Sequence, residues 1–488
     1  MTKGPEQSSL GSTPSSPPAT SHQFPGSSEK SDAQPAAEIS ASSNEPPDGG
    51  YGWVCVACCF LINAHTWGIN SSYAVFLAWY LSNNYYPNAS PLKFAFVGGL
   101  SISQSLLISP LATYTTREFG TRVTLLLGVI LETIALIGAS FTHQIWQLFL
   151  TQGICFGFGM GFLFVGSVGI IPQWFGKRRS LANGIGTAGS GIGALMYSLG
   201  TNAMIETLGV QWAFRILGIL CFVVNSICAI LMKDRNKDVG AKQLAFDYRL
   251  FLRSEYWLLL GWGFFSLLGY VVLLFSLPNF AQSIGLSAQQ GSLTAALLNL
   301  GQGIGRPAVG IFSDTAGRIN LAGLATFIAG FLSLLMWTFA RSYAVLIAFA
   351  IMVGTVSGTF WTAIGPVAAE VVGLRELPSC LSITWLFLVL PTTFSEPIGL
   401  ALRQKEGNIY LHAQIFTGLM YIAGALCMVL LRAWKIGQIE ATAIERSKSG
   451  SDATAASADG EKESLETSTA LGTQRASHFG RMVKWRRV

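Results

Sequence analysis

The sequence predicts an all-α membrane protein with twelve transmembrane helices arranged in two six-helix halves. Composition is the first observation, because hydrophobic residues make up 51% of the 488 residues and charged residues only 11%, whereas a soluble protein carries about 25% charged residues. The second observation is a series of apolar windows of about 20 residues, the length that crosses a bilayer. The third is an internal repeat, which divides the chain into two similar halves.

Twelve apolar windows follow one another between two polar tails. Residues 1–47 are rich in Ser and Pro and bury too little apolar surface to fold, so we expect a disordered tail there and another at 433–488. Because no apolar segment lies near Met1, a cleavable signal peptide is not expected. The windows are 53–81, 94–114, 121–141, 145–172, 181–204, 212–232, 256–279, 291–312, 320–340, 343–369, 379–401 and 411–432.

The two halves repeat at an offset of 197 residues. Residues 110–120 correspond to 307–317, and the G-x-x-x-G spacing at 157–161 recurs at 354–358. A repeat of this length is most simply explained by two six-span halves.

We therefore expect one half at 48–232 and the other at 256–432, joined by a charged cytoplasmic linker at 233–255. Two such halves with a solute site between them are typical of secondary transporters. Glycine-rich helix faces, here within 153–161 and 184–193, allow helices to approach closely enough to slide.

The distribution of Lys and Arg predicts the orientation. If the N-terminus is cytoplasmic, thirteen basic residues fall in inner loops and four in outer loops, so the positive-inside rule puts both tails in the cytoplasm. The net charge of +6 is then explained by topology and does not indicate nucleic-acid binding. The inner residues are Arg117, Arg122, Lys177, Arg178, Arg179, Lys233, Arg235, Lys237, Lys242, Arg249, Arg253, Arg318 and Arg375; the outer ones are Lys93, Arg341, Arg403 and Lys405.

We expect no cofactor, no metal site and no enzymatic site. Cys55 and Cys58 form a C-x-x-C, but all eight cysteines lie in apolar windows and no second ligand pair accompanies them. Gly184 to Gly189 spells G-x-G-x-x-G, yet no strand precedes it. The sequence has no Ser/His/Asp or H-E-x-x-H constellation, which favours a transporter over a membrane enzyme.

Arg306 is the leading candidate for a substrate contact. It shares one helical face with Asn299 and Gln302, and a guanidinium keeps its charge, which is costly at bilayer depth unless it faces protein, water or a ligand. We expect these three side chains to bind an anionic solute. Trp361 and Trp385 could stack on a planar solute, although aromatic residues in membrane helices more often pack.

The first window carries a second polar face. Asn63, Thr66, Asn70 and Tyr73 recur at helical spacing, and polar groups in lipid need partners. This face therefore lies toward the solute cavity, where Asn63, Asn70 and Tyr73 would bind substrate, or toward another helix. Both alternatives are open.

Two motifs resemble the signatures of the monocarboxylate transporter family of the major facilitator superfamily. DGGYGW at 48–53 stands at the start of the first window, and WFGKRRS at 174–180 begins a longer match that continues to residue 189. Residues 310–318 resemble the loop motif of the wider superfamily. The resemblance covers about 48–432 and looks like the fungal branch. It implies the major facilitator fold and alternating access.

The resemblance also implies a cytoplasmic gate. Lys177, Arg178 and Arg179 of the second signature, with Asp314 and Arg318 of the loop motif, are expected to form salt bridges that break when the halves rock. The alternative is that the three consecutive basic residues only set the topology.

Two departures from proton-coupled family members bear on coupling. Such members carry an Asp one turn before the Arg and a Lys in the first span, where this chain has Gln302 and Ser71, and neither can titrate. We therefore expect either facilitated diffusion or a proton route rebuilt on Glu132 or Glu396, which lie within apolar windows.

The sequence thus predicts a secondary transporter for a small organic solute, a monocarboxylate-like anion or a planar metabolite. Efflux of a fungal secondary metabolite and a non-transporting nutrient sensor are the alternatives. The expected partners are this solute and the lipid bilayer of the plasma membrane or, alternatively, the vacuolar membrane; no oligomeric state is predicted. Asn88 begins a glycosylation sequon in the first outer loop.

Overall fold

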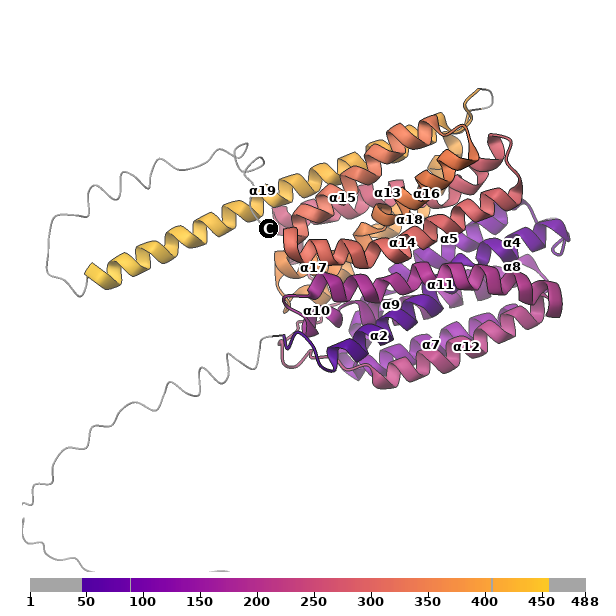
Figure 1. Ribbon diagram of the computed structural model, residues 1–488. Coiled ribbons are helices and arrows are strands. Elements are labelled where there is room, and N and C mark those ends of the chain that lie inside the picture. The colour runs from indigo at the N-terminus through magenta and orange to yellow at the C-terminus, as the bar shows by residue number, and fades with distance from the viewer. Residues whose placement is uncertain (1–45, 88, 405–406, 456–488) are drawn as a thin grey trace, which may run out of the picture. The chain divides into compact units, whose positions relative to one another are not determined.

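The computed structural model describes residues 46–87, 89–404 and 407–455, which form helices and no strand (Figure 1). The predicted glycosylation site at Asn88 and most of both predicted tails lie outside these residues.

The elements of the first half are α2 (Gly52–Asn63), η1 (Ala64–Gly68), α3 (Ile69–Ser71), α4 (Tyr73–Ser82), α5 (Pro91–Leu107), α6 (Ser109–Phe119), α7 (Thr121–Ala139), α8 (Ile145–Leu148), η2 (Phe149–Cys155), α9 (Phe156–Val168), α10 (Ile171–Trp174), α11 (Arg179–Leu208) and α12 (Val210–Leu231).

The second half begins after the linker and its short helix. Its elements are η3 (Tyr248–Leu252), α13 (Ser254–Ser283), α14 (Ala288–Ala316), α15 (Arg318–Leu332), η4 (Ser333–Trp337), α16 (Tyr343–Ser357), α17 (Thr359–Val372), α18 (Leu377–Ala401) and α19 (Leu411–Ala455). The helical segments follow the twelve predicted windows in order.

Nine helical segments in the described part of the chain are long and apolar enough to cross a bilayer, and the bent pair of α5 and α6 makes ten. This pair bends by 42° where Pro110 interrupts the helical hydrogen bonds. The other two windows form α11 and α14, in which glycine and polar residues lower the hydropathy. That these two helices also span the membrane stays a prediction.

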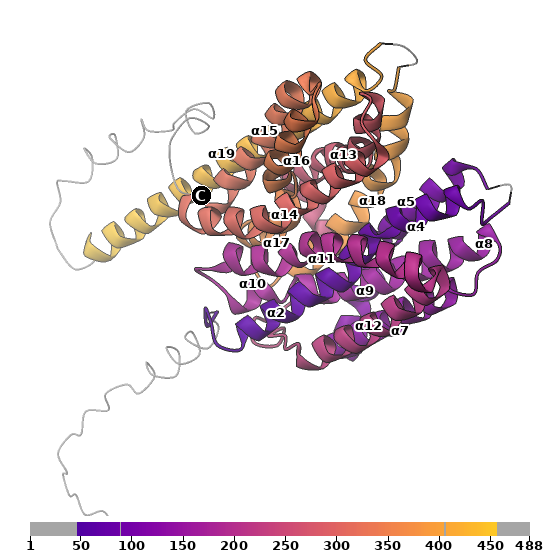
Figure 2. The same cartoon turned by 45° about the vertical axis from the view of Figure 1, so that its right-hand side comes forward.

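The two halves meet along α11 and α14, which lie side by side in Figures 1 and 2. Glycine permits the close approach. A Cβ atom at Gly184 would lie 2.5 Å from the carbonyl oxygen of Arg306, and one at Gly310 would lie 2.5 Å from the carbonyl oxygen of Ser180. Any larger side chain at these positions would push the halves apart.

The close contact covers only one end of the two helices. Its last glycine contact lies at Gly191, where a Cβ atom would be 2.7 Å from the carbonyl oxygen of Asn299. Farther along the same faces, Ser198 is partly exposed, and Asn202 of α11 and Ser292 of α14 are exposed. The halves are therefore joined tightly near the start of α11 and part toward its end.

The linker binds both halves. The backbone N–H of Arg235 donates to Gln173 Oε1 of α10 at 2.7 Å, whereas the N–H of Lys242 donates to the carbonyl oxygen of Arg375, before α18, at 2.7 Å. The segment thus crosses the junction of the halves at the end where α11 begins.

The last helix departs from the prediction. The sequence predicted a disordered tail from residue 433, but α19 continues without a break to Ala455 (yellow in Figure 1). Ala433 and Ile436 are buried, and Lys435 Nζ donates to the carbonyl oxygen of Glu370 at 2.8 Å. The predicted boundary was too early because hydropathy falls at the first charged residues, whereas one face of the helix still packs as far as Ile436.

Candidate functional site

A cavity lies between the two halves, around Arg306. It contains about 730 Å³ of empty space, including space open to solvent. Five of the six predicted substrate residues line it: Asn63 and Asn70 from the first half, and Asn299, Gln302 and Arg306 from the second. Their role in binding substrate stays a prediction, but the structure brings them together from three segments of the chain.

Arg306 is 6% exposed, and its charge meets only neutral oxygen atoms. Nη1 donates to the carbonyl oxygen of Thr187 at 2.7 Å and to Ser190 Oγ, and Nη2 donates to Gln302 Oε1 at 2.7 Å. No ion pair found among the described residues includes Arg306. Because a buried cation normally has an anionic partner, this guanidinium is suited to bind one supplied from outside the protein.

Two donors of the site have no hydrogen-bond partner among the described residues. They are Arg306 Nε and Gln302 Nε2, and both are buried. Gln302 Oε1 is already occupied, since it accepts from Arg306 and from Tyr270 Oη at 3.0 Å. The amide is thereby oriented with its oxygen toward the guanidinium, which leaves an N–H group beside a cation for an acceptor on the solute.

Tyr270 was not predicted from the sequence. It lies within the apolar helix α13 and lines the cavity. No polar periodicity marks it, because its neighbours in the sequence are apolar on every side. The one available signal was its hydroxyl group itself, which lies deep in an apolar window. An unsatisfied polar group is costly there, so the hydroxyl had to have a partner.

Aromatic side chains from both halves line another part of the cavity. The ring centroid of Trp67 in η1 lies 5.2 Å from that of Trp361 in α17, and Phe164 of α9 lies 5.5 Å from Trp67. Trp385 is 0% exposed and stacks on Trp361 at 5.8 Å with the ring planes 12° apart. Of the two tryptophans considered from the sequence, Trp361 lines the cavity and Trp385 packs behind it.

Tyr73 does not line this cavity and instead faces another helix, which is the second of the two alternatives that the sequence left open. Its hydroxyl donates to the carbonyl oxygen of Phe94 at 2.8 Å, and its ring lines a smaller neighbouring cavity together with Asn70. The prediction assumed one regular α-helix from Asn63 to Tyr73. The wider turns of η1 and the end of α3 at Ser71 change the angle between positions, so the spacing no longer gives a common face.

Glu132 and Glu396 also lie away from the cavity lining. Glu132 is 0% exposed on α7, where Oε2 accepts a hydrogen bond from Asn225 Nδ2 of α12 at 3.0 Å. Glu396 lies on α18, and its Oε2 is buried without a hydrogen-bond partner among the described residues. Their part in proton coupling stays a prediction.

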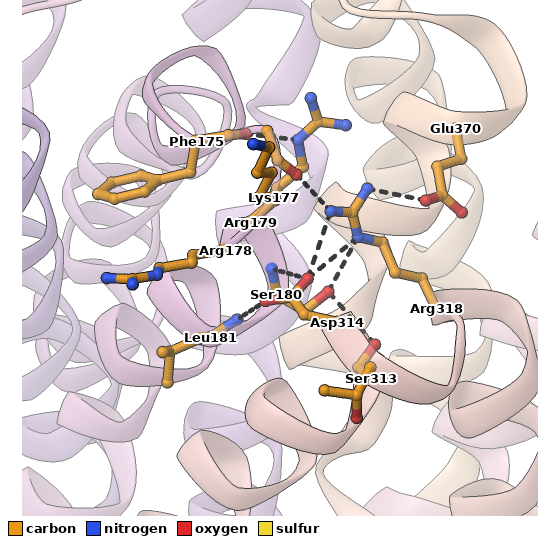
Figure 3. A network of polar contacts seen from close by, with 12 residues as sticks. Phe175, Lys177, Arg178, Arg179, Ser180, Leu181, Ser313, Asp314, Arg318 and Glu370 are labelled. Carbon is orange, nitrogen blue, oxygen red and sulfur yellow. Dashed lines mark hydrogen bonds and ion pairs between the residues drawn. The ribbon is translucent and has the colours of Figure 1, made fainter. Parts of the chain in front are cut away.

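A polar network joins the halves where α11 begins (Figure 3). Asp314 of α14 accepts hydrogen bonds from the N–H groups of Ser180 at 3.0 Å and Leu181 at 2.9 Å. These are free N–H groups of the first turn of α11, where a carboxylate is favoured by hydrogen bonding and by the helix dipole. A side chain of the second half thus caps a helix of the first.

Arg318 extends this network across the same junction (Figure 3). Its guanidinium forms ion pairs with Asp314 at 3.3 Å and with Glu370 of α17 at 2.7 Å, and Nη2 donates to the carbonyl oxygen of Gly176 at 2.5 Å. Glu370 was not predicted, although a lone acidic residue near the end of an apolar window is a signal that could have found it.

Lys177, Arg178 and Arg179 contribute differently from what was expected. Lys177 and Arg178 are exposed, and their backbone N–H groups donate to Asp48 Oδ1 at 2.8 and 3.3 Å. Arg179 Nε donates to the carbonyl oxygen of Phe175 at 2.8 Å. Within the described residues none of the three forms a salt bridge. In this conformation the ion pairs of the network are formed by Arg318 with Asp314 and Glu370, and a part for the three basic residues in a gate stays a prediction.

Comparisons with known proteins agree with this architecture. Residues 56–390 match the family model of the Major Facilitator Superfamily. The probable transporter MCH2 of Saccharomyces cerevisiae is 37% identical over 405 residues, which cover 82% of this chain and 86% of that protein. Monocarboxylate transporter 10 of Rattus norvegicus is 26% identical over 408 residues, which cover 79% of each chain.

A solved structure supports the fold independently. The fucose:proton symporter of E. coli superposes with a TM-score of 0.62 at 14% identity, over 78% of this chain and 98% of that chain. At this identity the likeness concerns the fold alone. The family model and the two relatives above, and not this structure, confirm the resemblance to the monocarboxylate transporter family that the signature motifs indicated.

Proposed function

Because the chain belongs to the Major Facilitator Superfamily and is therefore a transporter rather than an enzyme, we propose that it carries a small organic anion by alternating access. The observation that carries this proposal is the buried guanidinium of Arg306, which lines a cavity between the halves and meets no carboxylate among the described residues. A carboxylate on the solute would supply the missing charge.

The shape of the donor set favours a carboxylate over a neutral solute. Arg306 presents a planar fork that matches a carboxylate with two parallel hydrogen bonds, and Gln302 Nε2 offers a further donor beside it. The remaining lining includes the indoles of Trp67 and Trp361, so an apolar body on the solute would also find contact surface.

The polar network around Asp314 and Arg318 would act as the gate at the closed end of the cavity. The hydrogen bonds from Ser180 and Leu181 to Asp314, and from Arg318 to the carbonyl oxygen of Gly176, join the two halves, so rocking the halves apart at this end has to separate them. With the orientation predicted from Lys and Arg, this end is cytoplasmic, and the conformation described is open toward the outside. The gate then closes by hydrogen bonds that water can replace, while the ion pairs of Arg318 hold its side chain and that of Asp314 in place within the second half.

Export of a planar metabolite is the second candidate. The pair of tryptophans in the cavity lining favours it, because stacked aromatic surfaces bind planar molecules. Export and uptake use the same cavity and differ in which gradient drives the solute. A nutrient sensor on this fold would bind the solute without moving it.

The proposal is tested by flux measurements on purified full-length protein in liposomes. Labelled organic acids should enter vesicles with wild-type protein, whereas their uncharged amides should not. Arg306→Ala should lower the rate about 100-fold, the loss expected for two charge-assisted hydrogen bonds, and Arg306→Lys should restore only part of it because an ammonium lacks the planar fork.

A matched control is Arg341→Ala, which removes another arginine whose Nη1 bonds Asn408 Oδ1 in the outer loops, away from the cavity. This variant should transport as the wild type does. Wild-type rates in Arg306→Ala would contradict the proposed site, and binding of an acid without any flux would favour the sensor.

The predicted orientation has its own test. A cysteine introduced at Asn84, in a loop after α4, should react with an impermeant thiol reagent added outside intact cells. Reaction only after the membrane is permeabilised would show that the orientation is the opposite of the predicted one. The cavity would then open toward the cytoplasm.

A further inference from the structure

A smaller cavity lies inside the first half, next to the cavity around Arg306. We call it the side cavity; its polar lining residues are Asn70, Tyr73, Ser101 and Gln152. It contains about 280 Å³ of empty space, including space open to solvent. Asn70 lines both cavities, so its side chain is a wall that the two cavities share.

Gln152 is a buried polar residue of the side cavity without a partner. Its side chain is 8% exposed, and no hydrogen bond of its amide is found among the described residues. It belongs to the π-helical segment η2, and such wide turns occur often at functional sites. A buried amide that bonds nothing is unfavourable. The Gln152 amide is therefore suited to bind a group that enters the side cavity.

The amide of Asn70 offers a second free group at the shared wall. Ser101 Oγ lies 2.7 Å from Asn70 Oδ1 and 2.7 Å from the carbonyl oxygen of Gly98. Ser101 therefore engages one end of the Asn70 amide. For the other end, Nδ2, no hydrogen bond is found in the described part of the chain. Two amides, one at the wall and one inside, can thus bind the same small group.

The lining of the side cavity excludes an ion as the entering group. None of the described residues that line it is charged, and an ion there would lack a counter-charge. The other walls are apolar: Ile69, Phe76, Val97, Leu136 and Phe156. An amide both donates and accepts, and a hydroxyl group does the same in a small volume. The side cavity therefore suits a hydroxyl group.

We infer that the transported anion carries a hydroxyl group remote from its carboxylate, and that this hydroxyl binds between Asn70 and Gln152. The inference rests on the proposed function, in which Arg306 binds the carboxylate, and adds a second recognition point on the solute. The hydroxyl has to be remote because Arg306 belongs to α14 of the second half, whereas the side cavity is lined by the first half alone.

A site with unpaired amides discriminates against a solute that lacks the hydroxyl. The shorter solute leaves both amides to water or without a partner, and enzymes that hydrogen-bond a substrate hydroxyl reject the analogue without it for this reason. The hydroxyl should therefore raise the uptake rate at low concentration about tenfold, the factor expected for one hydrogen bond in a buried site.

Uptake by liposomes containing the full-length protein tests this preference. Labelled straight-chain acids from butyrate to octanoate are each compared with the acid that carries a hydroxyl at the far end of the chain. Initial rates are corrected for those of protein-free vesicles. We expect the hydroxyl to accelerate uptake at the chain length that reaches the side cavity. Lactate and propionate are the control pair, since their difference lies beside the carboxylate.

The outcomes separate this inference from the proposed function. Uptake of the plain acids with no gain from a terminal hydroxyl at any length would show that the side cavity holds only water. That result would overturn the inference and leave the anion transporter intact. A gain for lactate over propionate as large as that for the long acids would also overturn it. No uptake of any of these acids would contradict the proposed function for this class of solute.

Two variants of the side cavity locate the preference. Gln152→Leu keeps the size of the side chain and removes the amide, so the ratio of hydroxy acid to plain acid uptake should fall toward one. Ser101→Ala, which frees the Asn70 amide, should lower the same ratio and replaces the first variant if that one fails to insert. Uptake of the plain acid reports whether each variant is folded.

Gln104→Leu is the matched control, because Gln104 lies on α5 and lines neither cavity. It should keep the wild-type ratio. A wild-type ratio in both Gln152→Leu and Ser101→Ala would overturn the binding of a hydroxyl in the side cavity.

Discussion

Two glycine contacts in this molecule are alike in geometry and differ in what transport requires of them. Inside the first half, a Cβ atom at Gly159 of α9 would lie 2.5 Å from the backbone nitrogen of Glu132. Between the halves, one at Gly310 of α14 would lie 2.5 Å from the carbonyl oxygen of Ser180. Alternating access requires the second contact to open in every cycle and the first to stay closed.

The polar groups near each contact explain how this difference is built. Beside Gly159, the Glu132–Asn225 hydrogen bond is fully buried, so water cannot replace either partner when the contact is strained. Beside Gly310, the side chains of Asp314, Arg318 and Glu370 keep 11%, 12% and 25% exposure. Groups that water can reach exchange partners at little cost, so close glycine packing alone does not distinguish a fixed interface from a moving one.

The largest effect is expected from locking the moving contact. Ser180 Oγ and Ser313 Oγ lie 3.2 Å apart across the junction. In a background without the eight native cysteines, Ser180→Cys with Ser313→Cys should form a disulfide under oxidation, abolish transport, and recover it on reduction. Each single cysteine variant serves as the control. Normal transport by the oxidised pair would show that this end does not open.

The two glycines can be compared by the same substitution. Gly159→Ala should destabilise the protein by about 1–3 kcal/mol, because its clash is with backbone inside a fixed half. Gly310→Ala should melt near the wild-type temperature in detergent but transport more slowly, because its clash is relieved by rocking the halves apart. Equal losses of melting temperature would mean that the junction of the halves is as fixed as the interior of one half.

A smaller effect is expected from weakening the junction without adding bulk. Asp314→Asn removes the charge that Arg318 and the N-terminus of α11 share, and should lower the initial uptake rate about tenfold. Asp238→Asn is the control, since Asp238 is exposed and pairs only within the linker in the interactions found. If both variants transported alike, Asp314 would have no special part in the gate.

The smallest effect is expected inside the first half. Glu132→Gln keeps an oxygen that can accept from Asn225, so we expect uptake within about twofold of wild type. If transport is facilitative, collapsing the proton gradient should also change uptake little. Strong dependence on that gradient, lost in Glu132→Gln or in Glu396→Gln, would instead establish the proton route considered from the sequence.

The sequence was sufficient for the architecture because the bilayer imposes it. Apolar length predicts the spans, of which those formed by α11 and α14 stay a prediction; the repeat at 197 residues predicts two halves, and the signature at 48–53 with the WFGKRRS motif indicates the family. Arg306 could be singled out for the same reason, since a charge within an apolar window is costly and needs an explanation.

Local spacing was not sufficient where the helices are irregular or where charges compete for partners. Tyr73 could not be placed from its spacing, because η1 and the end of α3 change the helical phase and turn it away from the cavity that Asn63 and Asn70 line. The basic residues 177–179 were expected to form the gate's ion pairs, whereas Arg318 takes Asp314 and Glu370. Both cases concern which side chains come into contact across different helices. The distance between two such groups is not encoded in their separation along the chain.

By itself, then, the sequence determined that this protein is a two-half membrane transporter with a cation, Arg306, well inside one of its apolar windows. Only the tertiary structure decided that this cation has no carboxylate beside it among the described residues and that two of its three acceptors belong to the opposite half. The physical reason is that the apolar residues of a single helix are enough to predict that a charge within it is buried. Its neutralisation depends on the neighbours that packing brings within about 3 Å, the reach of a hydrogen bond.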